Sequence, residues 1–125
     1  MLALLIIKLY RGRISMSETN PKNKKIITYA ITGSNGFLGS YLSQYLESKG
    51  YKILRLGRDS SIDSKFKYHL NEELNTGSIL ASDTIIHCAF DRSDTNNDQK
   101  NKNLSAVKLL MNQIKQIKSN VKFIN

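Results

Sequence analysis

The sequence has few of the residues that mark several specialised classes of protein. Its 125 residues include one cysteine, one proline and no tryptophan. A single cysteine, Cys88, excludes an internal disulfide, and no set of cysteine and histidine residues has zinc-site spacing, so we expect no metal centre. Seven glycines and one proline exclude collagen-like and low-complexity chains. The cysteine content is compatible with a reducing compartment, and we expect a cytoplasmic protein.

The sequence also lacks an apolar run long enough to span a membrane. Residues 1–7 are apolar, whereas a span needs roughly 20 such residues. Basic residues follow this run, whereas a secretory signal places them before it. We expect residues 1–24 to form a poorly ordered polar and basic leader. Two alternatives stay open, namely that Met16 is the start and that the leader is a short membrane-surface anchor.

Most of the net charge of +9 comes from the two ends of the sequence. Residues 1–25 and residues 98–125 each hold six basic residues and one acidic residue, whereas residues 26–97 hold seven basic and eight acidic ones. A nucleic-acid-binding protein would be expected to combine basic and base-stacking groups on one surface. We therefore expect no nucleic-acid partner. The alternative, a small basic nucleic-acid-binding domain, predicts an affinity that falls steeply with salt.

Short apolar segments alternate with helical patterns along residues 25–125, which we expect to form one domain. The expected strands are Lys25–Thr32, Tyr51–Leu56, Phe66–Leu70, Thr84–Ala89 and Val121–Ile124, and the expected helices are Phe37–Lys49, Glu72–Leu80 and Asn96–Ser119. In the last helix the expected apolar stripe is Leu104, Val107, Leu110, Met111, Ile114 and Ile117. Nearly continuous apolar strands indicate a parallel sheet covered on both faces. We predict an α/β, Rossmann-like doubly wound sheet with strand order 3-2-1-4-5, ending after the fifth strand.

A glycine-rich segment joins the first expected strand to the first expected helix. Gly33 lets the chain turn sharply, Gly36 lets the backbone approach a pyrophosphate, and Gly39 lets the helix pack tightly on the sheet. The N–H groups and the dipole at the helix start favour a bound phosphate. The segment therefore predicts a dinucleotide site, with a ligand-free turn as the alternative.

The sequence GSNGFLG over residues 33–39 resembles the glycine motif of the extended short-chain dehydrogenase/reductases, also called NAD-dependent epimerase/dehydratases. Asp83–Ala89 resembles the fourth-strand motif of that family, and Asn103 with the leucine pair at 109–110 resembles the helix that follows it. This resemblance covers about residues 26–125. It implies an NAD(P)-binding domain of an epimerase, dehydratase or reductase that transfers hydride, often on nucleotide-activated sugars. A homodimer of the whole enzyme stays an open alternative.

The resemblance also implies which residues contact the cofactor. They are Gly33, Ser34, Asn35, Gly36, Phe37, Leu38, Gly39, Arg58, Ala89, Phe90 and Asn103. The acidic position that bonds the ribose in NAD enzymes falls on Gly57, and Arg58 follows it, which favours NADP because a guanidinium can grip the 2′-phosphate. NAD stays an alternative, since Asp59 could turn inward or pair with Arg58.

The catalytic Tyr-x-x-x-Lys pair of the family follows the fifth strand. Tyr45 and Lys49 have this spacing but lie on the first expected helix, so we reject them as catalytic and expect no catalytic residue in this sequence. We interpret His87 as a core histidine and Cys88 as a packing residue. We expect the chain to be the front part of a longer enzyme with a small-molecule substrate, inactive alone; a non-catalytic dinucleotide-binding or redox-sensing module is the alternative.

Overall fold

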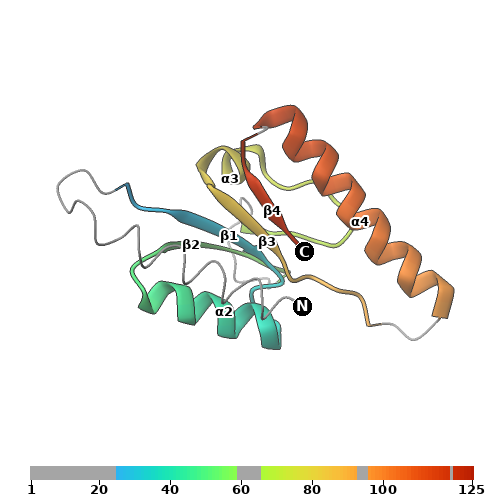
Figure 1. The fold of residues 1–125 in the computed structure, drawn as a ribbon. Coiled ribbons are helices and arrows are strands. Elements are labelled where there is room, and N and C mark those ends of the chain that lie inside the picture. The colour runs from blue at the N-terminus through green and yellow to red at the C-terminus, as the bar shows by residue number, and fades with distance from the viewer. Residues whose placement is uncertain (1–24, 59–65, 93–95, 119) are drawn as a thin grey trace.

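Strands and helices alternate along the chain in the computed structural model, which describes residues 25–58, 66–92, 96–118 and 120–125 (Figure 1). The elements are β1 (Thr28–Thr32), α2 (Phe37–Ser48), β2 (Lys52–Leu56), α3 (Thr76–Ala81), β3 (Thr84–His87), α4 (Asn96–Ile117) and β4 (Lys122–Ile124). The strands of the described residues form one four-stranded parallel sheet in the order β2-β1-β3-β4. The α/β class and the parallel sheet match the sequence-based prediction.

The expected strand over Phe66–Leu70 is wrong. This segment makes only an isolated parallel bridge, between Gly57 and Lys67, beyond the end of β2. The chain then turns at Asn71, whose φ of 69° lies in the left-handed region. The five-stranded order 3-2-1-4-5 is therefore not formed by the described residues, although the four strands that do form keep their expected relative order.

Apolar side chains pack against both faces of the sheet, and β1 supplies both sides because successive residues of a strand point to opposite faces. On one face, a cluster joins α2 to the sheet through Tyr29, Ile31, Leu42, Leu46 and Ile86. On the other face, α3 and α4 cover a cluster that contains Ala30, Leu56, Tyr68, Leu74, Ile79, Ile85, Leu110, Ile114 and Val121. All five residues of β1 are buried, as expected for the central strand of a doubly covered sheet.

Helix α4 buries only part of the apolar stripe that its sequence predicts. Leu104 and Met111 are 50% and 53% exposed, so the expected stripe is wrong at these positions. The buried face keeps Leu110 and Ile114 of the stripe and adds Ala106 and the polar Gln113. The Gln113 amide accepts a hydrogen bond from the backbone N–H of Leu74 at 2.8 Å and donates one to its carbonyl oxygen at 2.6 Å. Hydrogen bonding therefore helps to fix the rotation of the helix.

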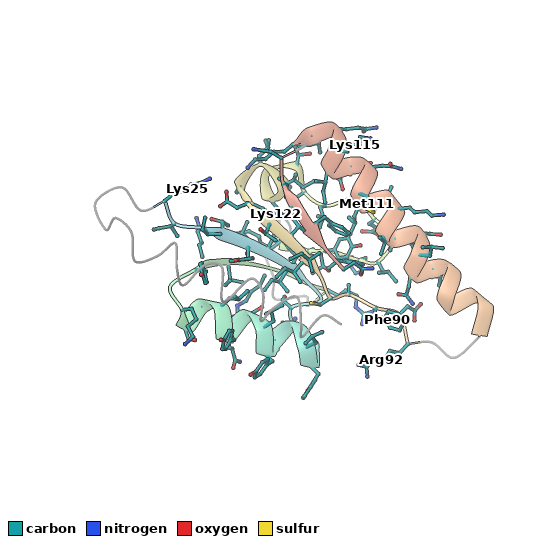
Figure 2. The ribbon with its side chains drawn as sticks, viewed as in Figure 1. Lys25, Phe90, Arg92, Met111, Lys115 and Lys122 are labelled. Carbon is teal, nitrogen blue, oxygen red and sulfur yellow. The ribbon has the colours of Figure 1, made fainter. Side chains whose placement is uncertain are left out.

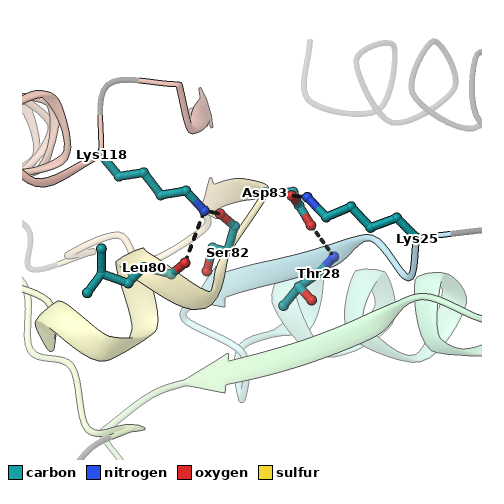
Figure 3. A network of polar contacts seen from close by, with 6 residues as sticks. All are labelled: Lys25, Thr28, Leu80, Ser82, Asp83 and Lys118. Carbon is teal, nitrogen blue, oxygen red and sulfur yellow. Dashed lines mark hydrogen bonds and ion pairs between the residues drawn. The ribbon is translucent and has the colours of Figure 1, made fainter.

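Polar contacts link the elements at the amino ends of the strands (Figure 3). The Asp83 carboxylate accepts hydrogen bonds from Lys25 Nζ at 2.7 Å and from the Thr28 N–H at 2.9 Å. Lys118 Nζ donates to two carbonyl oxygens at the end of α3, each 3.0 Å away. Burial by itself raises the pKa of the Asp83 carboxyl. The hydrogen bonds from Lys25 and Thr28 and the charges of Lys25 and Lys118 together outweigh it, so the pKa lies below its ordinary value.

The expected leader over residues 1–24, with its two alternatives, lies outside the described residues. None of the helices in the described part of the chain combines the length and the apolar character needed to cross a membrane.

The paired bonds of Gln113 generate a testable prediction about stability. Gln113→Met keeps the shape of the side chain but leaves the buried N–H and carbonyl of Leu74 without partners. We expect the free energy of unfolding to fall by about 2–4 kcal/mol, measured by urea denaturation. Gln116→Met is the matched control, because Gln116 is exposed on the same helix. Equal stability of the two variants would contradict the structural role of Gln113.

Candidate dinucleotide-binding site

The carboxyl ends of β1 and β3 bring two loops into contact. Thr32 and His87 are in register at these ends, and Gly33 follows Thr32 with a φ of 65°. A Cβ atom at Gly33 would lie 2.7 Å from the backbone nitrogen of Ala89 and 2.8 Å from its Cα atom. Only glycine therefore allows the chain leaving β1 to turn directly against the chain leaving β3.

The third glycine of the loop meets the first one. A Cβ atom at Gly39 would overlap the carbonyl oxygen of Gly33 and lie 2.8 Å from its carbonyl carbon. The glycine spacing predicts that Gly39 lets the helix pack on the sheet, whereas the tightest contact of Gly39 is with the loop itself. Gly36 is less crowded, since a Cβ atom there would meet only the Gly33 oxygen, at 3.3 Å. The loop thus folds back so that Gly36 and Gly39 both face the carbonyl group of Gly33.

The amino terminus of α2 opens at this loop. Gly36 is the N-cap residue, and within the described residues no side chain caps the helix and no acidic residue lies in its first turn. The N–H groups of the first turn have no partners inside a helix, and together with the helix dipole they favour an anion. The side chain of Phe37 is 90% exposed and points away from the core. Ser34 lies in the same loop and is 1% exposed; its hydroxyl makes no hydrogen bond to any described residue.

The segment after β3, Cys88–Asp91, forms a second wall beside the glycine loop. The Thr32 hydroxyl accepts hydrogen bonds from the backbone N–H groups of Cys88 and Ala89, at 3.1 and 3.2 Å. The amide of Asn103, on α4, accepts from the Asp91 N–H at 2.8 Å and donates to the Asp91 carbonyl at 3.1 Å. Phe90 lies between these two anchors and is 61% exposed. Figure 2 shows Phe90 and Arg92 at the end of the fold opposite Lys25.

Burial sets the protonation of His87, which precedes this wall in the chain, and of Cys88, its first residue. His87 is 4% exposed, and burial lowers its pKa to about 4, so its ring is neutral at pH 7. Burial raises the pKa of the Cys88 thiol to about 11, which leaves little of the reactive thiolate. His87 is confirmed as a core histidine, and the surroundings of Cys88 agree with a packing role.

The end of β2 reaches the same edge of the sheet. Leu56 is in register with Thr32, and its carbonyl accepts a bond from the Ser34 N–H at 3.3 Å. Gly57 is buried, and Arg58, directly after it, is exposed. Asp59, which could turn inward or pair with Arg58, lies outside the described residues. The positively charged Arg58 therefore follows β2 beside the glycine loop, and position 57 carries no carboxylate.

Tyr45 and Lys49 lie toward the far end of α2 from the glycine loop. The Tyr45 ring stacks on Tyr41 with a centroid separation of 6.3 Å, and Lys49 Nζ lies 5.6 Å from the Tyr45 centroid. Tyr41 is 64% exposed, so the stacked pair of tyrosines faces away from the sheet. This geometry separates the pair from the carboxyl edge of the sheet and agrees with its rejection as catalytic.

The contact between Gly39 and Gly33 predicts an unusual response to alanine. Alanine is the better helix former by up to about 1 kcal/mol, yet Gly39→Ala forces two backbone segments apart. We expect a net loss of about 1–3 kcal/mol in the free energy of unfolding, measured by urea denaturation. Gly36→Ala serves as the control, with a smaller cost of roughly 0.5–1 kcal/mol, because alanine is a poorer N-cap residue than glycine. A Gly39→Ala variant as stable as the control would refute the close packing of the loop.

The buried His87 predicts a pH dependence of stability. The unfolded chain takes up a proton at the ordinary histidine pKa of 6.5, whereas the folded chain does so at about 4. The contribution of the neutral His87 to the free energy of unfolding is therefore fully present above pH 6.5. It is lost as the pH falls from 6.5 to about 4, by up to about 1.4 kcal/mol per pH unit. Denaturation midpoints between pH 8 and pH 4 measure the effect. His87→Phe should flatten the profile in this window, whereas His69→Gln, which alters an exposed histidine, should leave it in place.

The comparisons with known proteins agree with this geometry. The model of the NAD dependent epimerase/dehydratase family matches residues 29–124. The chain is 32% identical over 95 residues to a sterol-4-alpha-carboxylate 3-dehydrogenase, decarboxylating, of Dictyostelium discoideum. That alignment covers 66% of this chain and 29% of the relative, so the chain spans less than a third of that protein.

Two solved structures share the fold. A nucleoside-diphosphate sugar epimerase from Corynebacterium glutamicum superposes with a TM-score of 0.54 and 21% identity, over 67% of this chain and 18% of the epimerase. A reductase engineered to attenuate substrate inhibition in asymmetric catalysis superposes with a TM-score of 0.57 and 17% identity, over 78% of this chain and 35% of the reductase. The family match spans most of the chain and includes the glycine loop, β3 and α4. The chain therefore belongs to the NAD-dependent epimerase/dehydratase family, the extended short-chain dehydrogenase/reductases.

Proposed function

We propose that residues 25–125 are the dinucleotide-binding part of an NAD(P)-dependent epimerase, dehydratase or reductase. The observation that carries this proposal is the cradle formed by Gly33, Gly36 and Gly39 at the uncapped start of α2. Side-chain atoms at the first and third of these positions would collide with backbone, and the helix start has no anionic side chain of its own in the described chain. These features fit a pyrophosphate group.

The remaining residues implied by the family resemblance take defined places around this cradle. The N–H groups of Ser34 and Gly36 already donate to the carbonyl oxygens of Leu56 and Gly33, so the backbone N–H groups of residues 37–39 at the start of α2 would hold the pyrophosphate. Ala89 and Phe90 would line the nicotinamide ribose. Asn103 would act indirectly, since its amide holds the backbone of Asp91. When bound, the nicotinamide supplies hydride transfer. The chain's own residues bind and orient the dinucleotide.

NADP is the proposed cofactor in preference to NAD. The family implies a nicotinamide dinucleotide, and the end of β2 favours the phosphorylated form because Gly57 offers no carboxylate to repel a 2′-phosphate. Arg58 is exposed at this position and can donate a fork of hydrogen bonds to a phosphate. Its guanidinium would be the main determinant of cofactor choice.

The proposed substrate is a nucleotide sugar or a similar molecule with an alcohol or carbonyl group. The names of the relatives support this class, since one is a nucleoside-diphosphate sugar epimerase and another a sterol-carboxylate dehydrogenase. We propose that the acid–base groups belong to other parts of the whole enzyme, because this chain spans only 29% of the sterol relative. A cytoplasmic location suits the unpaired thiol of Cys88.

Separate titrations with NADPH and NADH test the proposal, with nucleotide fluorescence as the readout. We expect both to bind, and NADPH to bind more tightly. Arg58→Glu should weaken NADPH binding by tenfold or more, which is about 1.4 kcal/mol, and should change NADH binding much less.

Lys115→Glu is the matched control because it changes the net charge equally at the C-terminal end of α4 (Figure 2). It should leave both affinities unchanged. Absence of binding by either nucleotide to folded protein would sink the functional proposal. Unchanged NADPH affinity in Arg58→Glu would overturn only the preference for NADP.

A further inference from the structure

The Thr32 hydroxyl has all of its hydrogen-bonding positions in use. A hydroxyl oxygen can accept two hydrogen bonds and donate one. Here the oxygen accepts from the N–H groups of Cys88 and Ala89, and the Cys88 N–H is shared with the Thr32 carbonyl oxygen at 3.2 Å. The single hydroxyl proton is left for His87 Nδ1, which lies 2.7 Å away. This count of donors and acceptors favours Nδ1 as the acceptor of the hydroxyl proton, with the ring proton on Nε2.

The surroundings of His87 hold the ring in one position. Phe123 stacks on it with a centroid separation of 6.1 Å, and Tyr68 meets it edge-on at 6.0 Å. These two contacts restrict rotation of the ring away from Thr32, which keeps Nδ1 within reach of the hydroxyl proton. With the proton fixed, both lone pairs of the Thr32 oxygen point toward the segment after β3.

We propose that Thr32 and His87 are positioning residues, which set the separation between the glycine loop and the Cys88–Asp91 segment and thereby the affinity for the dinucleotide. This inference rests on the proposed function and names the device that aligns the two walls of its site. Asn103 anchors the far end of the same segment through Asp91. The near end depends on the Thr32 hydroxyl, whose orientation depends in turn on His87.

The spacing matters because the two walls are already in close contact. A Cβ atom at Gly33 would lie 2.7 Å from the backbone nitrogen of Ala89. A shift of Ala89 by a fraction of this distance moves the proposed ribose wall relative to the pyrophosphate cradle. A ligand that touches both walls then loses contact with one of them, which costs affinity without unfolding the chain.

A set of threonine variants of the full 125-residue chain tests the proposal. Thr32→Val keeps the shape but removes the hydroxyl, whereas Thr32→Ser keeps the hydroxyl. Thr84→Val is the matched control, because Thr84 is equally buried in the sheet and its hydroxyl bonds to no described residue. NADPH affinity is measured by titration, and urea denaturation gives the folded fraction of each variant.

We expect Thr32→Val to weaken NADPH binding by about tenfold after correction for the folded fraction, the loss of roughly one well-made hydrogen bond. Thr32→Ser should stay within about threefold of the unaltered chain, and Thr84→Val should bind as that chain does. A Thr32→Val variant that loses stability but keeps its affinity would show a purely structural role and overturn the inference. Failure of the unaltered chain to bind would instead identify a failure of the proposed function, on which the inference rests.

Histidine variants separate hydrogen bonding from packing. His87→Phe keeps an aromatic ring beside Tyr68 and Phe123 but has no acceptor for the Thr32 proton, whereas His87→Asn offers a carbonyl oxygen near the place of Nδ1. We expect His87→Phe to bind NADPH about tenfold more weakly and His87→Asn to keep most of the affinity. Equal affinities per folded molecule would contradict the positioning role.

Nitrogen NMR of the His87 ring provides a readout that needs no ligand. The inference requires a neutral ring with the proton on Nε2 at pH 7. A proton on Nδ1 would overturn it whatever the binding data show.

Discussion

The approach of the chain leaving β1 to the chain leaving β3 is the constraint on which the site depends. Gly33 has no room for a side chain against Ala89, and the Thr32 hydroxyl ties the two segments together. This contact fixes where the glycine loop begins. It also places the residues after β3 beside that loop, so two stretches of sequence that are more than fifty residues apart become one site.

Much of this arrangement could be predicted from the sequence, because it depends on local patterns. The apolar strand before Gly33, the glycine spacing and the amphipathic helix after it indicate a strand–loop–helix unit, which β1 and α2 form. The alternation of strands and helices indicates a parallel sheet. The role of Gly39 was harder to predict, since its close contact with the Gly33 carbonyl depends on how the loop folds back on itself.

The errors arose where tertiary contacts override local pattern. Phe66–Leu70 has strand-forming residues, yet it pairs at a single bridge, and the chain turns at Asn71 soon after it. The apolar stripe of α4 suggested that Met111 is buried, but Gln113 turns inward to bond Leu74. The hydrogen bond between Thr32 and His87 also cannot be predicted from a local sequence pattern, since 55 residues separate the two.

That separation has a consequence for how the molecule reaches its native state. β1 can pair with β2 through a short crossover, but its other edge stays unsatisfied until β3 has been synthesised or has diffused into place. Closing so long a loop costs conformational entropy before any contact repays it. The βαβ unit of β1, α2 and β2 is therefore expected to form before β3 pairs with β1, and the bond between Thr32 and His87 can form only once that pairing is made.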